Sequence, residues 1–308
     1  MFKDYKGPLI LLMTSFIWGL AFVFQSVGMD YIGPFLFNAL RFFIGAFVLI
    51  IVKIISFIKE KKHNKEAKFI TKKTLIAGLI CGVFILLGCS FQQVGIVTTD
   101  AGKSGFITAL YILFVPLLGL FFKKKTSWNC WVSIGIALIG FVFLCLVGNF
   151  SKIAIGDIYL LICSILFACQ ILTVDKFIND CDPIMISCLQ FIIAGIGSII
   201  ISACFEEWSL SSILDAKWAV LYTGVLSCGV GYTTQMVGQK YTKPSVASLL
   251  LSLESVFALL TGLAFLQETL TWYEGVGCIF IFIAIIFSQI TFEKKERDEE
   301  KTNETQQI

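Results

Sequence analysis

Long apolar runs recur along the whole 308-residue chain and constrain its fold more tightly than any other feature. Several exceed the ~18 residues that mark a transmembrane helix. They are about twice as long as a barrel strand and lack its alternation, so helices satisfy their backbone groups in lipid. Only 15% of the residues are charged, against about 25% in soluble proteins. We expect an all-α integral membrane protein. Its ten transmembrane helices are expected at roughly 8–28, 34–58, 75–97, 104–122, 128–147, 157–175, 184–204, 217–238, 245–265 and 272–291.

Basic residues gather in alternate loops, which predicts the orientation of the spans. Residues 59–73 hold seven lysines and residues 123–125 hold three more. If both termini lie in the cytoplasm, the cytoplasmic segments carry 19 of the 24 Lys and Arg residues, as the positive-inside rule requires. The first span is too long for a signal peptide and no small-x-small cleavage site follows it. We expect a multi-pass cell-membrane protein with cytoplasmic N- and C-termini.

Two segments of the chain resemble each other at an offset of 142–144 residues. Residues 91–122 align with residues 233–266, and Gly119 aligns with Gly262. Five spans per unit is an odd number, so the second unit is expected to enter the membrane upside down, as in many secondary transporters. The expected units are a first five-helix repeat at 1–150, a second at 151–292 and a charged, disordered cytoplasmic tail at 293–308.

The stretch FIWGLAFVFQSVGMDYIGPFLFNALRFFIGA, residues 16–46, carries a family resemblance. Its Trp18-Gly19 pair, Pro34 and, seven residues on, Arg41 resemble the first two helices of EamA-type transporters of the drug/metabolite transporter superfamily. The resemblance implies an inverted-repeat transporter that is not an enzyme.

Two further stretches extend this resemblance over about 8–291. Residues 99–119 resemble the family's helix 3–4 signature, and residues 245–271 resemble its later counterpart, ending in the family's glutamate, here Glu268. Many members carry a proline after the helix-9 glutamate, where this chain has Ser255. The resemblance indicates the superfamily and does not indicate a substrate.

Arg41 and Glu254 are charged residues placed inside expected spans. A charge in the membrane is costly, so each is expected to face a cavity or a partner. Arg41 either contacts substrate or forms a structural pair or helix cap. Glu254 either couples transport to a proton or contacts substrate, or it pairs with Arg41 or caps a helix.

Uncharged polar and aromatic residues inside the spans are candidates for a substrate cavity. Trp18 and Gln25 share a helix face, and Ser104, Thr108 and Tyr111 form one helical stripe. The alternative for each is packing or hydrogen bonding between helices. The cavity candidates are Trp18, Gln25, Gln93, Thr108, Tyr111, Gln170, Tyr232 and Gln235.

This composition favours a secondary transporter that exports a small neutral or zwitterionic metabolite, such as an amino acid. A drug/cation–proton antiporter of the same fold is the alternative, because the carboxylate of Glu254 inside a span is compatible with that function. A membrane-embedded transferase is the third, although no catalytic motif supports it.

His63 is the only histidine, the eleven cysteines lie mostly in apolar runs without a C-x-x-C pair, and there is no Walker A motif, so we expect no metal, cofactor or direct ATP use. The expected partners are a small-molecule substrate, the lipid bilayer and a coupling proton, with no nucleic acid, and the protein is expected to be a monomer or homodimer.

Overall fold

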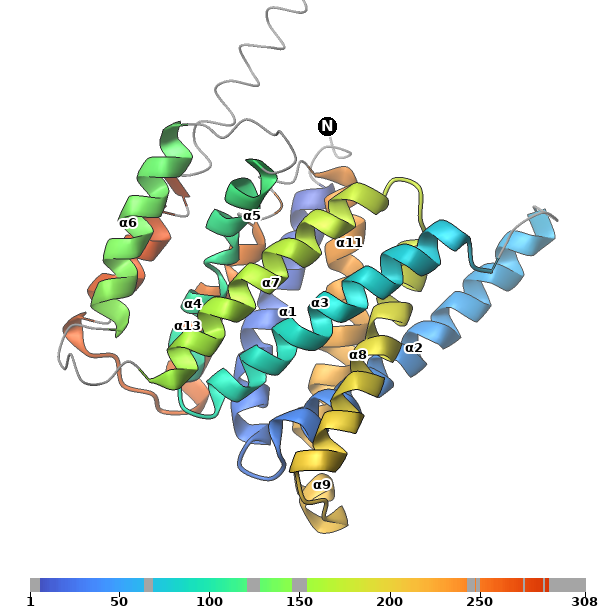
Figure 1. The fold of residues 1–308 in the computed structure, drawn as a ribbon, viewed down its shortest axis with the longest axis horizontal. Coiled ribbons are helices and arrows are strands. Elements are labelled where there is room, and N and C mark those ends of the chain that lie inside the picture. Colours follow the sequence, from blue (N-terminus) through green and yellow to red (C-terminus); the bar gives the residue numbers. More distant parts are fainter. Residues whose placement is uncertain are drawn as a thin grey trace, which may run out of the picture.

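The computed structural model describes residues 6–63, 69–120, 128–145, 154–242, 247, 250–273, 275–284 and 286–287. Within these ranges all regular secondary structure is helical, which confirms the expected all-α class (Figure 1). The lysines of the 123–125 turn and the 293–308 tail lie outside the described residues. The elements of the first half are α1 (Lys6–Gly28), α2 (Pro34–His63), α3 (Lys72–Ile96), α4 (Ala101–Thr108), α5 (Tyr111–Gly119) and α6 (Trp128–Cys145). Those of the second half are α7 (Ile155–Phe177), α8 (Pro183–Phe205), α9 (Leu210–Asp215), α10 (Lys217–Leu221), η2 (Tyr222–Gly231), α11 (Tyr232–Tyr241), α13 (Glu254–Phe265) and a last apolar helix, Gly275–Ala284.

Six helical spans among the described residues are long and apolar enough to cross a membrane. They are α1, α2, α3, the α4–α5 stretch, α7 and α8. Large apolar side chains such as Phe47 and Ile200 are exposed on the outer faces of these helices. Exposed apolar side chains are expected where a helix faces lipid. The expectation of a membrane protein is confirmed.

Two expected spans are interrupted at matching positions. The span predicted at 104–122 is two helices, with a turn at Ala109–Leu110 between α4 and α5. The span predicted at 245–265 has a turn at Leu253, directly before α13. The offset between the two turns is the offset of the internal repeat. The interruption is therefore a property of both repeats.

The span predicted at 217–238 is also not one regular helix. It consists of α10, a ten-residue π-helical segment η2 and α11. Such wide turns are uncommon and concentrate at functional sites. In η2, Gly224 lies so close to α2 that an added Cβ would stand 2.8 Å from the side chain of Ile44. The segment therefore brings its backbone against the first half of the chain.

Equivalent helices of the two halves run antiparallel, and side chains join their ends. Glu206, which follows α8, accepts hydrogen bonds from the backbone N–H groups of Phe35 and Leu36 at the start of α2 (2.8 and 2.7 Å). At the other end of the same pair, Lys53 of α2 binds Asp182, the N-cap of α8, at 2.8 Å. The start of α2 thus lies beside the end of α8, and the two helices are opposite in direction (Figure 1).

The α4–α13 pair has the same arrangement. Glu268, which follows α13, accepts hydrogen bonds from the N–H groups of Ala101 and Gly102 at the start of α4 (2.6 and 3.1 Å). Carboxylates are favourable at helix N-termini, where N–H groups lack intrahelical partners. Both contacts join a carboxylate of the second half to a helix start of the first half, as an inverted repeat requires.

Candidate transport site

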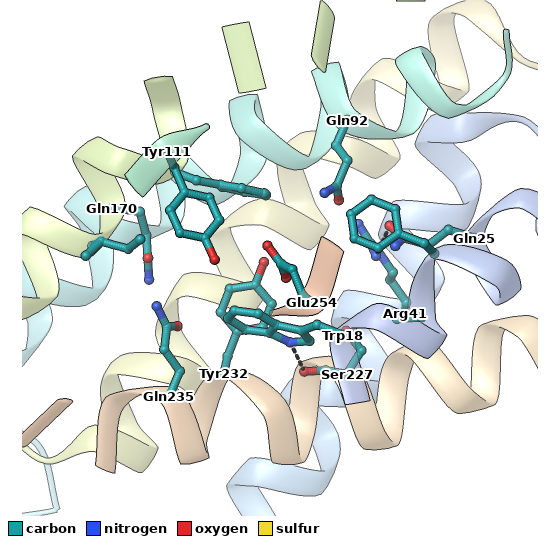
Figure 2. A pocket seen from close by; sticks show the side chains of 14 residues that line it. Trp18, Gln25, Arg41, Gln92, Tyr111, Gln170, Ser227, Tyr232, Gln235 and Glu254 are labelled. Carbon is teal, nitrogen blue, oxygen red and sulfur yellow. Dashed lines mark hydrogen bonds between the residues drawn. The ribbon is translucent and has the colours of Figure 1, made fainter. Parts of the chain in front are cut away.

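A central cavity lies between the two halves of the chain. It has about 470 Å³ of empty space, including its open part. Figure 2 shows its polar and aromatic lining. The first half supplies Trp18, Ala21, Phe22, Gln25, Arg41, Gln92 and Tyr111, and the second half supplies Phe167, Gln170, Ile171, Ser227, Tyr232, Gln235 and Glu254.

One wall of the cavity is aromatic. The rings of Trp18 and Tyr232 lie 4.7 Å apart between centroids and are tilted by 55°. The indole N–H of Trp18 donates to the backbone carbonyl of Ser227 in η2 at 3.3 Å, so the ring is held against the second half (Figure 2). Phe191 meets Tyr232 edge to face at 5.3 Å. Such rings provide a flat apolar surface with a polar edge.

Arg41 lies at one side of the cavity and is 3% exposed. Its Nη1 donates to Oε1 of Gln25 at 2.7 Å, while its Nε and Nη2 have no hydrogen-bond partner among the described residues. The backbone carbonyl of Gln25 accepts a further bond from Gln93 at 3.1 Å. Arg41 therefore has one hydrogen-bond partner, Gln25, and most of its N–H donors have no acceptor among the described residues.

Glu254 lies near the middle of the lining and is 4% exposed. It is the first residue of α13, beside the turn at Leu253. No Lys or Arg of the described chain forms an ion pair with it, so it does not pair with Arg41. In Figure 2 the hydroxyl of Tyr111, the first residue of α5, points toward its carboxylate.

Amide side chains lie at the side opposite Arg41 (Figure 2). Gln170 of α7 donates to Gln190 of α8 at 3.5 Å, the limit of a hydrogen bond. The carbonyl oxygen of Gln235 has no partner among the described residues. Buried amides without full partners are costly, unless water or a solute completes their hydrogen bonds.

Two of the candidate residues do not line this cavity. Gln93 is fully buried and binds the backbone of Gln25, so it acts between helices. Thr108 is buried at the end of α4, and its hydroxyl has no partner among the described residues. The expected stripe of Ser104, Thr108 and Tyr111 does not form one face of this cavity, because only Tyr111 is among its lining residues.

Sequence reasoning missed other lining residues, among them Gln92, Phe167 and Ser227. Gln92 and Gln93 are both glutamines inside an apolar span, so the sequence marks them equally. Which of the two faces the cavity depends on the rotation of the helix about its axis, which the sequence does not determine. Nothing in the sequence distinguishes Phe167 from the many other phenylalanines of the chain. Within the described residues, no group of three or more His, Cys, Asp or Glu side chains is placed to hold a metal ion.

Comparison with known proteins identifies relatives over nearly the whole chain. Residues 5–146 and residues 154–289 each match the model of the EamA-like transporter family. An uncharacterized transporter of Archaeoglobus fulgidus is 30% identical over 92% of this chain and 86% of its own length. The uncharacterized transporter YoaV of Bacillus subtilis is 24% identical over 94% of this chain and 99% of its own.

Two further matches concern location and fold. The uncharacterized inner membrane transporter YedA of Escherichia coli is 24% identical over 88% of this chain and 86% of its own. A solved crystal structure superimposes with a TM-score of 0.69 at 16% identity, covering 95% of this chain and 99% of the other. At that identity the likeness concerns the fold alone.

Proposed function

The chain belongs to the EamA-like transporter family, and from this premise we propose that it is a secondary transporter that moves a small metabolite, such as an amino acid, out of the cell by alternating access. The site of transport is the central cavity. The proposed orientation places both termini in the cytoplasm, and the proposed repeats are residues 1–150 and 151–292.

The observation that carries this proposal is the origin of the cavity lining. Each half of the chain supplies seven of the residues, from helices that run in opposite directions. In transporters built from inverted repeats, the substrate lies between the repeats near the midplane, and interrupted helices contribute to the site. Tyr111 and Glu254, which follow the two helix interruptions, meet this description.

Alternating access requires contacts between the halves that separate at one end at a time. Glu206 and Glu268 join the halves at one end of the bundle. The ion pairs of Lys53 with Asp182 and of Lys73 with Asp180 join them at the opposite end. Each contact connects a carboxylate of the second half to a helix of the first half, so a rocking motion would break one set while keeping the other.

A drug/cation–proton antiporter is the second candidate. The observation in its favour is Glu254, a buried carboxylate in the cavity without a basic partner among the described residues. A buried unpaired charge is unfavourable, so either a proton or a cationic solute would neutralise it. Both candidates share the fold and the cavity, and they differ in the charge of the solute.

Solute flux in proteoliposomes tests the proposal. The purified protein should exchange radiolabelled amino acids or organic cations across the membrane without ATP. Trp18→Leu removes one aromatic ring from the cavity wall and should lower the flux at least about fivefold, because such a ring contributes about 1–3 kcal/mol. Trp128→Leu changes a tryptophan that is 77% exposed and should leave the flux unchanged. Absence of flux for every solute, together with turnover of a lipid substrate, would favour a membrane enzyme instead.

A further inference from the structure

We propose that Arg41 is the carboxylate-binding group of the cavity and that Glu254 binds a cationic group of the same solute, so that the substrate is a zwitterion. This inference rests on the proposed transport function and names the substrate class of its site.

Arg41 is fixed in place but its donors are largely unused. Gln25 holds Nη1, and the rings of Phe42 and Phe37 lie 5.1 and 5.7 Å from the guanidinium carbon. Nε and Nη2 remain without acceptors in the part of the chain that the structure describes. A planar guanidinium presents paired N–H groups whose spacing matches a carboxylate. A buried, oriented and incompletely paired arginine is therefore suited to bind one.

Glu254 supplies the opposite charge at a separate point of the same cavity. Its carboxylate and the Arg41 guanidinium both line the space, yet they form no ion pair with each other. Figure 2 places Arg41 with Gln25 and Gln92 at one side, with Glu254 between them and Gln170. The lining of the cavity thus presents one positive and one negative group that are not paired with each other.

The two charges select against ions of a single sign. A solute that is only an anion would satisfy Arg41 and meet repulsion from Glu254, and a simple cation would meet the reverse. A zwitterion satisfies both groups and adds no net charge to a buried site, which limits the desolvation cost. The rest of the solute would extend toward Tyr111 and the Gln170–Gln235 side, where aromatic and amide groups line the space.

Ligand binding by the wild-type protein tests the inference without any mutation. The common L-α-amino acids are screened by thermal shift, and each one that stabilises the protein is compared with its α-amide and its N-acetyl derivative in titration calorimetry. We expect both derivatives to bind at least about tenfold more weakly, since each leaves one buried charge without its partner. An α-amide or N-acetyl derivative that binds within about threefold of its parent would overturn the inference.

Variants then assign the discrimination to Arg41. In Arg41→Gln the acid and its amide should bind with similar affinity, while Arg41→Lys should keep part of the preference. The control is Lys61→Met, which removes an exposed cation of α2 that lies outside the cavity lining and should keep the full preference. If Arg41→Gln does not fold, the comparison of ligands on the wild-type protein decides alone.

The two proposals fail separately. Transport of solutes that lack a carboxylate, at rates equal to those of amino acids, would overturn the zwitterion site and leave the transport function in place. Absence of any solute binding and any flux would overturn both.

Discussion

Tyr111 and Glu254 each begin the second segment of an interrupted helix, and both side chains line the central cavity. They lie at the offset of the internal repeat, so the same position in the two halves carries a phenol in one and a carboxylate in the other. Inverted halves place these positions face to face, and in Figure 2 the phenol hydroxyl points toward the carboxylate. Among the described lining residues, Glu254 is the one acidic group, and it arises from the sequence divergence at this position.

Replacing Glu254 by glutamine tests whether this carboxylate carries a coupling proton. Glutamine keeps the shape and cannot be protonated or deprotonated. If Glu254 couples transport to protons, uptake into proteoliposomes should lose its response to an imposed pH gradient. The measurement is the ratio of uptake with and without the gradient, in wild type and Glu254→Gln, and an unchanged ratio would remove Glu254 from coupling. Tyr111→Phe is the control for disturbance of the same region, because it removes the facing hydroxyl and keeps the carboxylate.

Gly19 is expected to be intolerant of any side chain. A Cβ at this position would clash with the Cβ of Phe257 and would stand 2.9 Å from the carbonyl oxygen of Glu254. Gly19→Ala should therefore force α1 and α13 apart and destabilise the protein by about 1–3 kcal/mol, as overpacking does. The matched control is Gly135→Ala, where a Cβ would meet nothing within 4 Å, and which should leave the melting temperature unchanged or slightly raised.

These stability changes can be followed with a thiol-reactive dye. Among the described residues, Cys81, Cys89, Cys163, Cys188 and Cys228 are free and buried, so they react when the bundle unfolds. An equal melting temperature for Gly19→Ala and Gly135→Ala would contradict the close contact of α1 with α13.

Glu268→Ala should weaken the contact between the two halves at the start of α4. The substitution leaves the N–H groups of Ala101 and Gly102 without their acceptor. Because the side chain is half-buried, we expect a loss of about 1–2 kcal/mol. Glu207→Ala, at an exposed position, is the matched control and should have no measurable effect. A melting temperature for Glu268→Ala equal to that of the control would show that this contact does not hold the end of the bundle closed.

The Lys53–Asp182 pair predicts an asymmetry between its two partners. The lysine side chain is 3% exposed and the aspartate 36% exposed. Asp182→Asn keeps the N-cap of α8 but leaves a buried cation unpaired, which should cost about 2–4 kcal/mol. Lys53→Met leaves only a solvated carboxylate and should cost less.

The second ion pair at this end is the control for that comparison. Lys73 and Asp180 are more than half exposed, so Asp180→Asn should leave the melting temperature unchanged. A Lys53→Met variant that is less stable than Asp182→Asn would contradict the assigned burial.

The spans could be predicted from the sequence because hydrocarbon requires long apolar helices, but their interruptions could not. The turn at Ala109–Leu110 lies in an apolar run without glycine or proline at the break, and Pro116 further along lies inside α5. The turn at Leu253 likewise has no local signal. The local sequence therefore does not mark these turns, since tertiary context can override local propensity.

The types of residue in the candidate site could be predicted from the sequence, but the exact set of lining residues could not. Arg41 and Glu254 stood out because charges inside apolar runs are rare. The choice of Gln92 over Gln93 depends on the rotation of α3, and the contact of Glu206 with α2 joins residues about 170 positions apart. Contacts of that sequence separation follow from the folded topology and are not visible in the neighbouring residues.

The inverted arrangement of the two halves is the claim on which the transport proposal depends, and cysteine labelling tests it most directly. Among the described cysteines only Cys204 is exposed, so single cysteines are introduced at Lys124 and at Thr269 in a Cys204→Ser background. These positions lie in equivalent segments of the internal sequence repeat. In intact cells a membrane-impermeant maleimide should label Thr269→Cys and should reach Lys124→Cys only after permeabilisation. Labelling of both positions from the same side of the membrane would contradict the inverted repeat and the alternating access built on it.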